Sequence, residues 1–337
     1  MTDSSVETVT TTTRSSPTGP RRVSGGGWFV LPLVIVFTVF YVWPALNTVI
    51  GSFFRWSLFD PWSLTEPDNW DFVGFGNYIA ELTSAEFWNA VVNTLVWLVV
   101  FPALVGAVAL LVAVAIWYVP RGARIYRTVF ILPMTISLAA AGVIWTFMYD
   151  PDFGTLPAAI ESLNVGFDFD LGWLALRTGS FLSDPGQLVI GPITIHFVNL
   201  SLIVAGFWAF TGFGVITITA GLAGIPETIV EAARVDGAKP GQILRHIIIP
   251  SLRRSLLVVA AVSVIFALRT FDIVWVITQG GPQNDSEVLA VRLWKEAFVF
   301  LDTPQAGNGT AIAVIMSVAL IALSGRYLKT LISDDEP

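Results

Sequence analysis

The chain has 337 residues, of which 54% are hydrophobic and only 13% are charged, whereas about 25% of the residues in an average soluble domain are charged. This composition excludes an ordinary water-soluble protein. The net charge of −7 gives no sign of the basic surface that nucleic-acid binding requires. The chain has no cysteine, so disulfides and thiol chemistry are excluded as well.

The N-terminal residues 1–27 are rich in Ser, Thr, Gly and Arg, a composition that predicts a disordered tail. The first apolar run, residues 28–50, is longer than the apolar part of a typical signal peptide. No small-residue cleavage site follows it, so we expect this run to be a retained membrane span.

Six apolar runs are long enough to cross the ~30 Å hydrocarbon core of a bilayer, which needs about 20 helical residues. They cover about 28–50, 88–118, 125–148, 195–222, 255–278 and 309–331. We therefore predict an all-α fold, a polytopic helical bundle of about six transmembrane helices over residues 28–331. Residues 149–194 are too polar to span and are expected to form a small outer lobe, and residues 332–337 a polar tail.

Lys and Arg are unevenly distributed between the segments that connect these runs. With the N-terminus inside the cell, thirteen of the 18 Lys and Arg residues fall on the cytoplasmic side and four on the outer side. Cytoplasmic loops of membrane proteins are enriched in these residues. The sequence therefore predicts a multi-pass protein of the cell membrane with both termini in the cytoplasm.

One charged segment, residues 225–250, interrupts the apolar pattern on the cytoplasmic side. Pro226 suits the first turn of a helix, where the helix dipole also favours the charge of Glu231 and its neighbours. Gly237 can adopt the left-handed conformation that ends a helix, and Pro240 can begin a second short helix. A basic amphipathic hairpin on the membrane surface and a docking site for another protein both fit these features.

Two ionisable residues, Arg269 and Asp272, fall within the fifth apolar run. They are one helical turn apart, so in a continuous helix they can pair. Charge within a membrane is expensive and usually faces the bundle interior or a water-filled path. A structural ion pair and a role in the substrate path are compatible interpretations of the two residues.

Several chemistries lack the residues that they need. The only histidines, His196 and His246, lie on opposite predicted sides of the membrane, which argues against a metal site and a Ser-His-Asp arrangement. None of the three lysines follows a glycine, so a phosphate-binding loop of the G-x-x-x-x-G-K-[ST] type is ruled out. The chain is expected not to be an enzyme.

The charged segment resembles the cytoplasmic coupling loop of binding-protein-dependent ABC importer permeases. The resemblance rests on Glu231-Ala232-Ala233, on Gly237 four residues later, and on the run that ends at Pro250. A second motif runs from Phe271-Asp272 to Gly280-Gly281-Pro282. It is similar to the carbohydrate-uptake branch of this family, the MalF/UgpA-like permeases of sugars and glycerol phosphate.

This resemblance implies a partner permease, two copies of a cytoplasmic ATPase that binds ATP and Mg, and an external solute-binding protein. The chain itself would hold no cofactor. The residues implied at the ATPase contact are Glu231, Ala232, Ala233, Asp236 and Gly237. Those implied along the substrate path are Trp208, Ala209, Phe210, Phe213, Leu268, Arg269 and Thr270. Asp272 is added to these candidates because it is an ionisable residue within the fifth run. Packing or lipid-facing aromatic residues are the alternative for the fourth run.

The leading hypothesis is therefore a permease subunit for a di- or oligosaccharide or a related polyol. A glycerol-phosphate permease is the second, because the guanidinium of Arg269 suits phosphate, although Asp272 would neutralise that charge. An ion-coupled secondary transporter is a third hypothesis, which usually requires inverted repeats and several buried ionisable groups. A membrane enzyme is the fourth, and no catalytic constellation supports it.

Overall fold

The computed structural model describes residues 27–59, 61, 71–119, 122–163, 168–170, 175–177, 181–184, 186–299 and 305–333. The chain divides into two compact units, at Asn47 and Thr48, and each is described by itself. The predicted tails at 1–27 and 332–337 lie almost wholly outside the described residues.

The first unit contains one helical rod with a single π-helical turn. It consists of α1 (Gly27–Phe37), the turn η1 (Thr38–Val42) and the start of α2 (Trp43–Gly51). Its apolar side chains, such as Phe40 at 70% exposure, face outward along the rod. A helix that is apolar all round suits a hydrocarbon environment, in agreement with the first predicted span.

The second unit is helical apart from short hairpins. Its helices are α3 (Gly76–Thr83), α4 (Ala85–Tyr118), α5 (Ala123–Ile131), η3 (Leu132–Thr135), α6 (Leu138–Tyr149), α7 (Thr155–Leu163), α8 (Val198–Ala223), α9 (Glu227–Val235), α10 (Pro240–Ile243), η4 (Leu244–Ile248), α11 (Ile249–Ser251), α12 (Arg253–Leu268), α13 (Asp272–Ile277), α14 (Leu289–Trp294), η5 (Lys295–Val299) and α15 (Ala306–Ser333). The prediction of an all-α, polytopic bundle is confirmed.

The strands form three antiparallel two-stranded hairpins. They are β1 (Phe54–Arg55) with β2 (Asp71–Phe72), β3 (Asp168–Asp170) with β4 (Ala175–Arg177), and β5 (Gln187–Ile190) with β6 (Ile193–His196). The last two hairpins and α7 lie between residues 155 and 196. The described part of residues 149–194 thus contains a short helix and hairpin strands, and the outer lobe stays a prediction.

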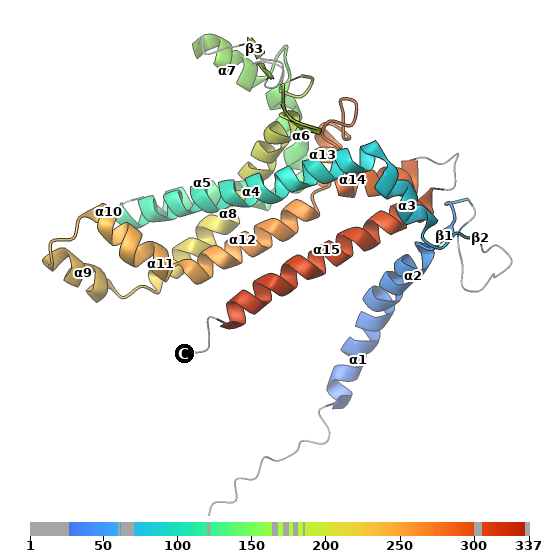
Figure 1. The fold of residues 1–337 in the computed structure, drawn as a ribbon. Helices are drawn as coiled ribbons and strands as arrows, with labels where there is room; N and C mark the ends of the chain where they lie inside the picture. The colour runs from blue at the N-terminus through green and yellow to red at the C-terminus, as the bar shows by residue number, and fades with distance from the viewer. Residues whose placement is uncertain are drawn as a thin grey trace, which may run out of the picture. The chain divides into compact units, whose positions relative to one another are not determined.

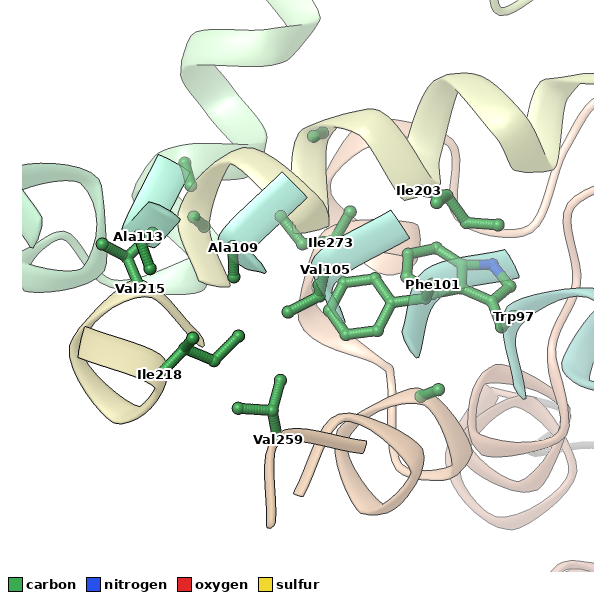
Figure 2. Packing of buried hydrophobic residues seen from close by; sticks show 14 of the residues in the cluster. Trp97, Phe101, Val105, Ala109, Ala113, Ile203, Val215, Ile218, Val259 and Ile273 are labelled. Atoms are coloured by element: carbon green, nitrogen blue, oxygen red, sulfur yellow. The ribbon is translucent and has the colours of Figure 1, made fainter. Parts of the chain in front are cut away.

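The core of the second unit lies where α4, α8 and α12 pack together (Figure 1). Figure 2 shows Val105 and Ala109 of α4 facing Val215 and Ile218 of α8 and Val259 of α12. Small residues bring the helices close: a Cβ added to Gly214 would lie 2.7 Å from the Cβ of Ala109. Without a strong hydrophobic drive inside a membrane, helices associate through such close packing.

Two buried asparagines fix the relative direction of α4 and α8. The Nδ2 atom of Asn199, near the start of α8, donates to Oδ1 of Asn93, near the start of α4, at 2.9 Å. The two helices therefore run in the same direction. We call their C-terminal ends the far ends and their N-terminal ends the near ends; α12 runs in the opposite direction, from the far ends to the near ends. The segment α9–α11 lies at the far ends, and α13 and α14 lie at the near ends (Figure 1).

Two of the six predicted spans are not continuous helices. Within the described part of the chain, four helices are long and apolar enough to span a membrane, and two bent pairs bring the number to six. In the third span, α5 with η3 meets α6 at 101°, because Ile136 and Ser137 are extended. The second bent pair joins Pro240–Ser251 to α12 at 64°. The fifth predicted span, 255–278, breaks separately, between the end of α12 at Leu268 and the start of α13 at Asp272, so the expectation of one helix through Arg269 and Asp272 is wrong.

Candidate functional site

The predicted coupling loop folds into two short helices joined by a tight turn. Pro226 precedes α9 as its N-cap, and Gly237 ends it with a φ of +81°. The N–H of Ala238 donates to the carbonyl of Ala233, and that of Gly237 to the carbonyl of Arg234. This is the hydrogen-bond pattern of a Schellman motif, so the predicted left-handed conformation of Gly237 is confirmed.

The second half of the coupling loop begins at Pro240, as predicted, and continues to Ser251. The side chain of Gln242 accepts a hydrogen bond from the N–H of Lys239 at 2.8 Å, which closes the N-terminus of α10. The π-helical turn η4 re-aims the helix, so that Ile243 and Ile248 are both buried. Together with Val230 of α9, these side chains anchor the loop to the ends of the long helices.

The opposite face of α9 is uncovered. Glu231 and Ala232 are exposed, and Val235 is 87% exposed, an unusual state for an apolar side chain. Glu231 has no hydrogen bond or ion pair to any residue that the structure describes. Next to this face, Asp236 and Gly237 line a groove of about 380 Å³ between the C-terminal turn of α9 and the helix formed by α10 and η4. The structure thus brings all five predicted docking residues onto one short helix and its C-terminal turn.

A second site, which we call the break cavity, lies where α12 ends at Leu268 and α13 starts at Asp272. Its volume is about 310 Å³. The intervening backbone is irregular, with Phe271 at φ −135° and ψ −58°. Non-helical backbone at membrane depth occurs where it is buried in protein or lines a water-filled cavity. The break therefore places polar groups beside an open cavity on this chain.

The break cavity contains about half of the predicted substrate-path residues. Phe210, Arg269, Thr270 and Asp272 line it. The other four do not. Ala209 is buried in the core, Trp208 packs on Trp145 of α6, Phe213 packs behind Phe210, and Leu268 lines a separate cavity against α15.

Arg269 and Asp272 do not form the ion pair that the sequence suggested. Neither takes part in any ion pair among the described residues, and both side chains are exposed to the cavity region. The reason is the helix break, because the one-turn spacing brings two side chains together only in a continuous helix. One cation and one anion are therefore both available to a ligand.

Sequence reasoning missed several apolar members of the cavity lining. Phe266 and Phe271 flank the break, and Leu138, Val262, Ile265 and Ile273 complete the lining. Phe266 also stacks on the buried Phe101, with ring centroids 4.9 Å apart. The four-residue spacing from Val262 to Phe266 follows one face of α12, and this periodicity is the signal that could have identified these two residues.

The Gly-Gly-Pro motif forms a tight loop held from two directions. Gly280, Gln283 and Asn284 have positive φ values, and the Gly281–Pro282 peptide is cis. Nδ2 of Asn93 donates to the carbonyls of Asp285 and Glu287 at 3.0 and 2.9 Å. Asn199 donates to the same Asp285 carbonyl at 3.0 Å. The starts of α4 and α8 thus hold this loop in place.

Beside this loop lies a buried ionic cluster around Arg292 of α14. The guanidinium contacts Glu81 at 2.8 Å, Glu296 at 3.3 Å and Glu287 at 3.5 Å, and Glu287 also pairs with Lys295. Three carboxyl groups face two cations, so ionisation of all three would leave the cluster with an excess of negative charge. Burial chiefly, and then the nearby Glu81, raises the pKa of Glu296 to about 7.

Comparisons with known proteins agree with this geometry. Residues 105–334 match the family described as binding-protein-dependent transport system inner membrane component. The chain is 34% identical, over 87% of its own length and 94% of the relative, to the osmoprotective compounds uptake permease protein GgtC of Synechocystis sp.. It is 30% identical, over 89% of its own length and 93% of the relative, to the sn-glycerol-3-phosphate transport system permease protein UgpA of Rhizobium meliloti.

A solved structure has the same fold. It is a chain of a bacterial alginate ABC transporter in complex with an alginate pentasaccharide-bound periplasmic protein. Its TM-score is 0.67 with 17% sequence identity, over 90% of this chain and 92% of that chain. The family match includes the coupling loop and both sides of the helix break. The chain therefore belongs to the family of binding-protein-dependent transport system inner membrane components, as a membrane-embedded permease subunit of an ABC importer and not its ATPase.

Proposed function

We propose that this permease carries an uncharged sugar or polyol through the break cavity. The observation that supports this proposal best is the combination of aromatic and polar groups in the cavity lining. The aromatic rings are Phe210, Phe266 and Phe271, and the polar residues are Arg269, Thr270 and Asp272. Ligand pockets typically combine apolar walls with a few placed polar groups. A sugar matches both parts, since its ring has apolar C–H faces and a rim of hydroxyl groups.

The charges of the cavity favour an uncharged ligand. Arg269 donates hydrogen bonds and Asp272 accepts them, so together they suit a row of hydroxyl groups. The names of two relatives point in different directions. GgtC is an uptake permease for osmoprotective compounds, which leaves room for an uncharged solute, whereas UgpA is a permease for sn-glycerol 3-phosphate, an anion.

Glycerol phosphate is the second candidate substrate. Arg269 is not neutralised by an ion pair in the described structure, which favours an anion more than the sequence alone did. Asp272 lines the same cavity, however, and a phosphate would lie near its carboxylate. For this reason we place the uncharged ligand first. The hypothesis of an ion-coupled secondary transporter is set aside, since the matched family is binding-protein-dependent.

We further propose that the coupling loop is the contact with a cytoplasmic ATPase. The exposed face of Glu231, Ala232 and Val235, and the adjacent groove, support this proposal. The complete importer would contain a second permease, two copies of the ATPase that bind ATP and Mg, and an external solute-binding protein. The N- and C-termini would then lie in the cytoplasm, as would the coupling loop, whose position at the far ends of α4 and α8 is compatible with this orientation.

The test is ATP hydrolysis by the complete complex in proteoliposomes, with the binding protein and a panel of maltose, trehalose, sucrose and glycerol 3-phosphate. One sugar should stimulate hydrolysis, and Glu231→Ala should abolish most of that stimulation. Glu161→Ala, an exposed glutamate in α7, is the matched control and should behave as wild type. Stimulation by glycerol 3-phosphate alone would select the second candidate, and unchanged hydrolysis in Glu231→Ala would reject the docking role.

A further inference from the structure

Four aromatic rings at the start of α13, in α13, in α14 and in η5 contact one another, and we call them the aromatic ladder: Phe271, Trp275, Trp294 and Phe298. The first three are in mutual contact, and Phe298 extends the group from Trp294. The rings of Phe271 and Trp275 are stacked, with centroids 5.7 Å apart. Trp294 lies 5.7 Å from Phe271 and 6.3 Å from Trp275. Phe298 follows, 4.5 Å from Trp294. The rings come from two segments of the chain, on either side of the Gly-Gly-Pro loop.

One end of the aromatic ladder is part of the break cavity. Phe271 lines that cavity together with Arg269 and Asp272. At the other end, the side chains of Trp294 and Phe298 are 37% and 42% exposed. The ladder therefore connects the break cavity with the segment that follows the Gly-Gly-Pro loop, without a gap between successive rings.

The exposed rings of Trp294 and Phe298 lie on a helix that buried ion pairs hold in place. Arg292 and Glu296, on either side of Trp294 in sequence, are 8% and 7% exposed and take part in the ionic cluster with Glu81. Their side chains point into the protein, so the α14–η5 helix cannot turn its aromatic face away without breaking buried ion pairs. Binding groups supported in this way keep their geometry.

We propose that the aromatic ladder is a second sugar-binding site, a track on which a pyranose ring binds by its apolar face before it enters the break cavity. The inference rests on the proposed function, since it requires a sugar as substrate. Aromatic side chains offer large apolar faces, and the indole N–H of Trp275 and Trp294 adds a polar edge. A sugar can therefore bind at the exposed rings of Trp294 and Phe298 without a dedicated set of hydrogen bonds. From Trp294 it can pass to the neighbouring Phe271 at the cavity.

Two other occupants of the exposed rings are lipid and the partner permease. Lipid chains need only apolar surface, so an aliphatic side chain of similar size would serve them as well as a ring. A permease interface would make the rings necessary for assembly of the complex. A sugar track instead requires the aromatic face itself. Variants that keep or remove the aromatic ring therefore distinguish a lipid, a partner permease and a sugar as the occupant.

The experiment measures uptake kinetics of the complete complex in proteoliposomes, with radiolabelled maltose, trehalose, sucrose and glycerol 3-phosphate. The variants are Trp294→Leu, which keeps an apolar side chain, and Trp294→Tyr, which keeps an aromatic one. Trp88→Leu is the control, an exposed tryptophan of α4 outside the ladder. An aromatic contact contributes about 0.5–1.5 kcal/mol beyond its buried area. We therefore expect Trp294→Leu to raise KM about 3- to 10-fold for the imported sugar.

The expected pattern has a raised KM in Trp294→Leu with the maximal rate retained, and a KM near wild type in Trp294→Tyr and Trp88→Leu. Unchanged uptake in Trp294→Leu would overturn the ladder and leave the sugar function standing. Loss of the partner permease from the purified Trp294→Leu complex would also overturn it, because the ring would then be an interface residue. Absence of sugar uptake by the wild type would overturn the proposed function, and the ladder with it.

Discussion

The Nε atom of Arg292 donates to Oε2 of Glu81 at 2.8 Å, and this contact joins α14 to α3 across 211 residues of sequence. Both side chains are nearly inaccessible to solvent. Removing one partner of a buried ion pair leaves an uncompensated charge and typically costs about 3–5 kcal/mol. The contact therefore determines how the segment after the Gly-Gly-Pro loop is held.

Arg292→Met should lower the thermal stability of the purified complex more than the same substitution of an exposed arginine. The variant leaves Glu81, Glu287 and Glu296 buried beside each other without the guanidinium. Scanning calorimetry of the complex in detergent measures the effect, with Arg55→Met as the control. Arg55 pairs with Asp71, but both side chains are more than half exposed, and such pairs contribute about 0–1 kcal/mol. Equal shifts in the two variants would contradict a structural role for the cluster.

The stability of the complex should fall as the pH rises from about 4.5 to 7, because of Glu296. Burial first, and then the charge of Glu81, raises the pKa of this carboxyl to about 7 from an ordinary value of 4.5, against the opposing effect of Arg292. Within that window the folded state holds a proton that the unfolded state has lost, so the free energy of unfolding decreases with pH.

Glu296→Gln should remove this part of the pH dependence and should be more stable than wild type at pH 8. The amide keeps an oxygen that can accept from Nη2 of Arg292, which is 3.3 Å from the carboxylate. Calorimetry at pH 5 and pH 8 measures the difference. If stability changed between pH 5 and pH 8 by the same amount in wild type and in Glu296→Gln, Glu296 would not be the source of the pH dependence.

Gly237→Ala should reduce substrate-stimulated ATP hydrolysis by distorting the end of α9. Gly237 has a φ of +81°, and a left-handed conformation costs a residue with a Cβ roughly 1–2 kcal/mol. Gly241→Ala is a matched control: it lies in the same loop, a Cβ there also meets no atom within 4 Å, and its φ is not in the left-handed range. Equal activity of the two variants would mean that the Schellman turn does not matter for coupling.

Asp272→Asn should make the break cavity more receptive to anions. Among the described residues that line the cavity, Arg269 would then be the only charged one. We expect glycerol 3-phosphate to compete with sugar uptake about 10-fold more strongly than in wild type, since a hydrogen bond to a charged group contributes about 1.5–3 kcal/mol. Competition assays in proteoliposomes measure the change. No change in competition would place Arg269 and Asp272 outside the substrate path.

The sequence predicted the features that depend on local chemistry. Gly237 ends α9 in the predicted conformation. Four of the apolar runs correspond to long helices and the third run corresponds to a bent pair. The sequence did not predict the break after Leu268, because neither proline nor glycine occurs between Arg269 and Asp272. That break depends on tertiary packing of α13 against α6: a Cβ added to Gly142 would lie 2.9 Å from Val276.

The ionic cluster and the aromatic ladder could not be predicted from the sequence either. Glu81 and Arg292 are far apart along the chain, and nothing in their neighbourhoods indicates that they meet. Trp275 and Trp294 are separated by the Gly-Gly-Pro loop, and only the fold of that loop brings their rings to 6.3 Å. Helical periodicity on α12, in contrast, could have identified Phe266 one turn after Val262.

The central claim, that an uncharged sugar passes through the break cavity, is tested most directly by blocking the cavity. Ile265 lines it and is 36% exposed. Ile265→Trp should therefore fill the cavity with little effect on the packed core. Val258 lies two turns earlier on the same helix, is 38% exposed and does not line the cavity, so Val258→Trp is the control.

The measurement is uptake of the radiolabelled panel by the complete complex in proteoliposomes, with ATP and the binding protein. Wild type and Val258→Trp should import a sugar only when both are present, and Ile265→Trp should not import it although its basal ATP hydrolysis persists. Sugar uptake by Ile265→Trp at the wild-type rate, or uptake of glycerol 3-phosphate in place of any sugar, would contradict the account.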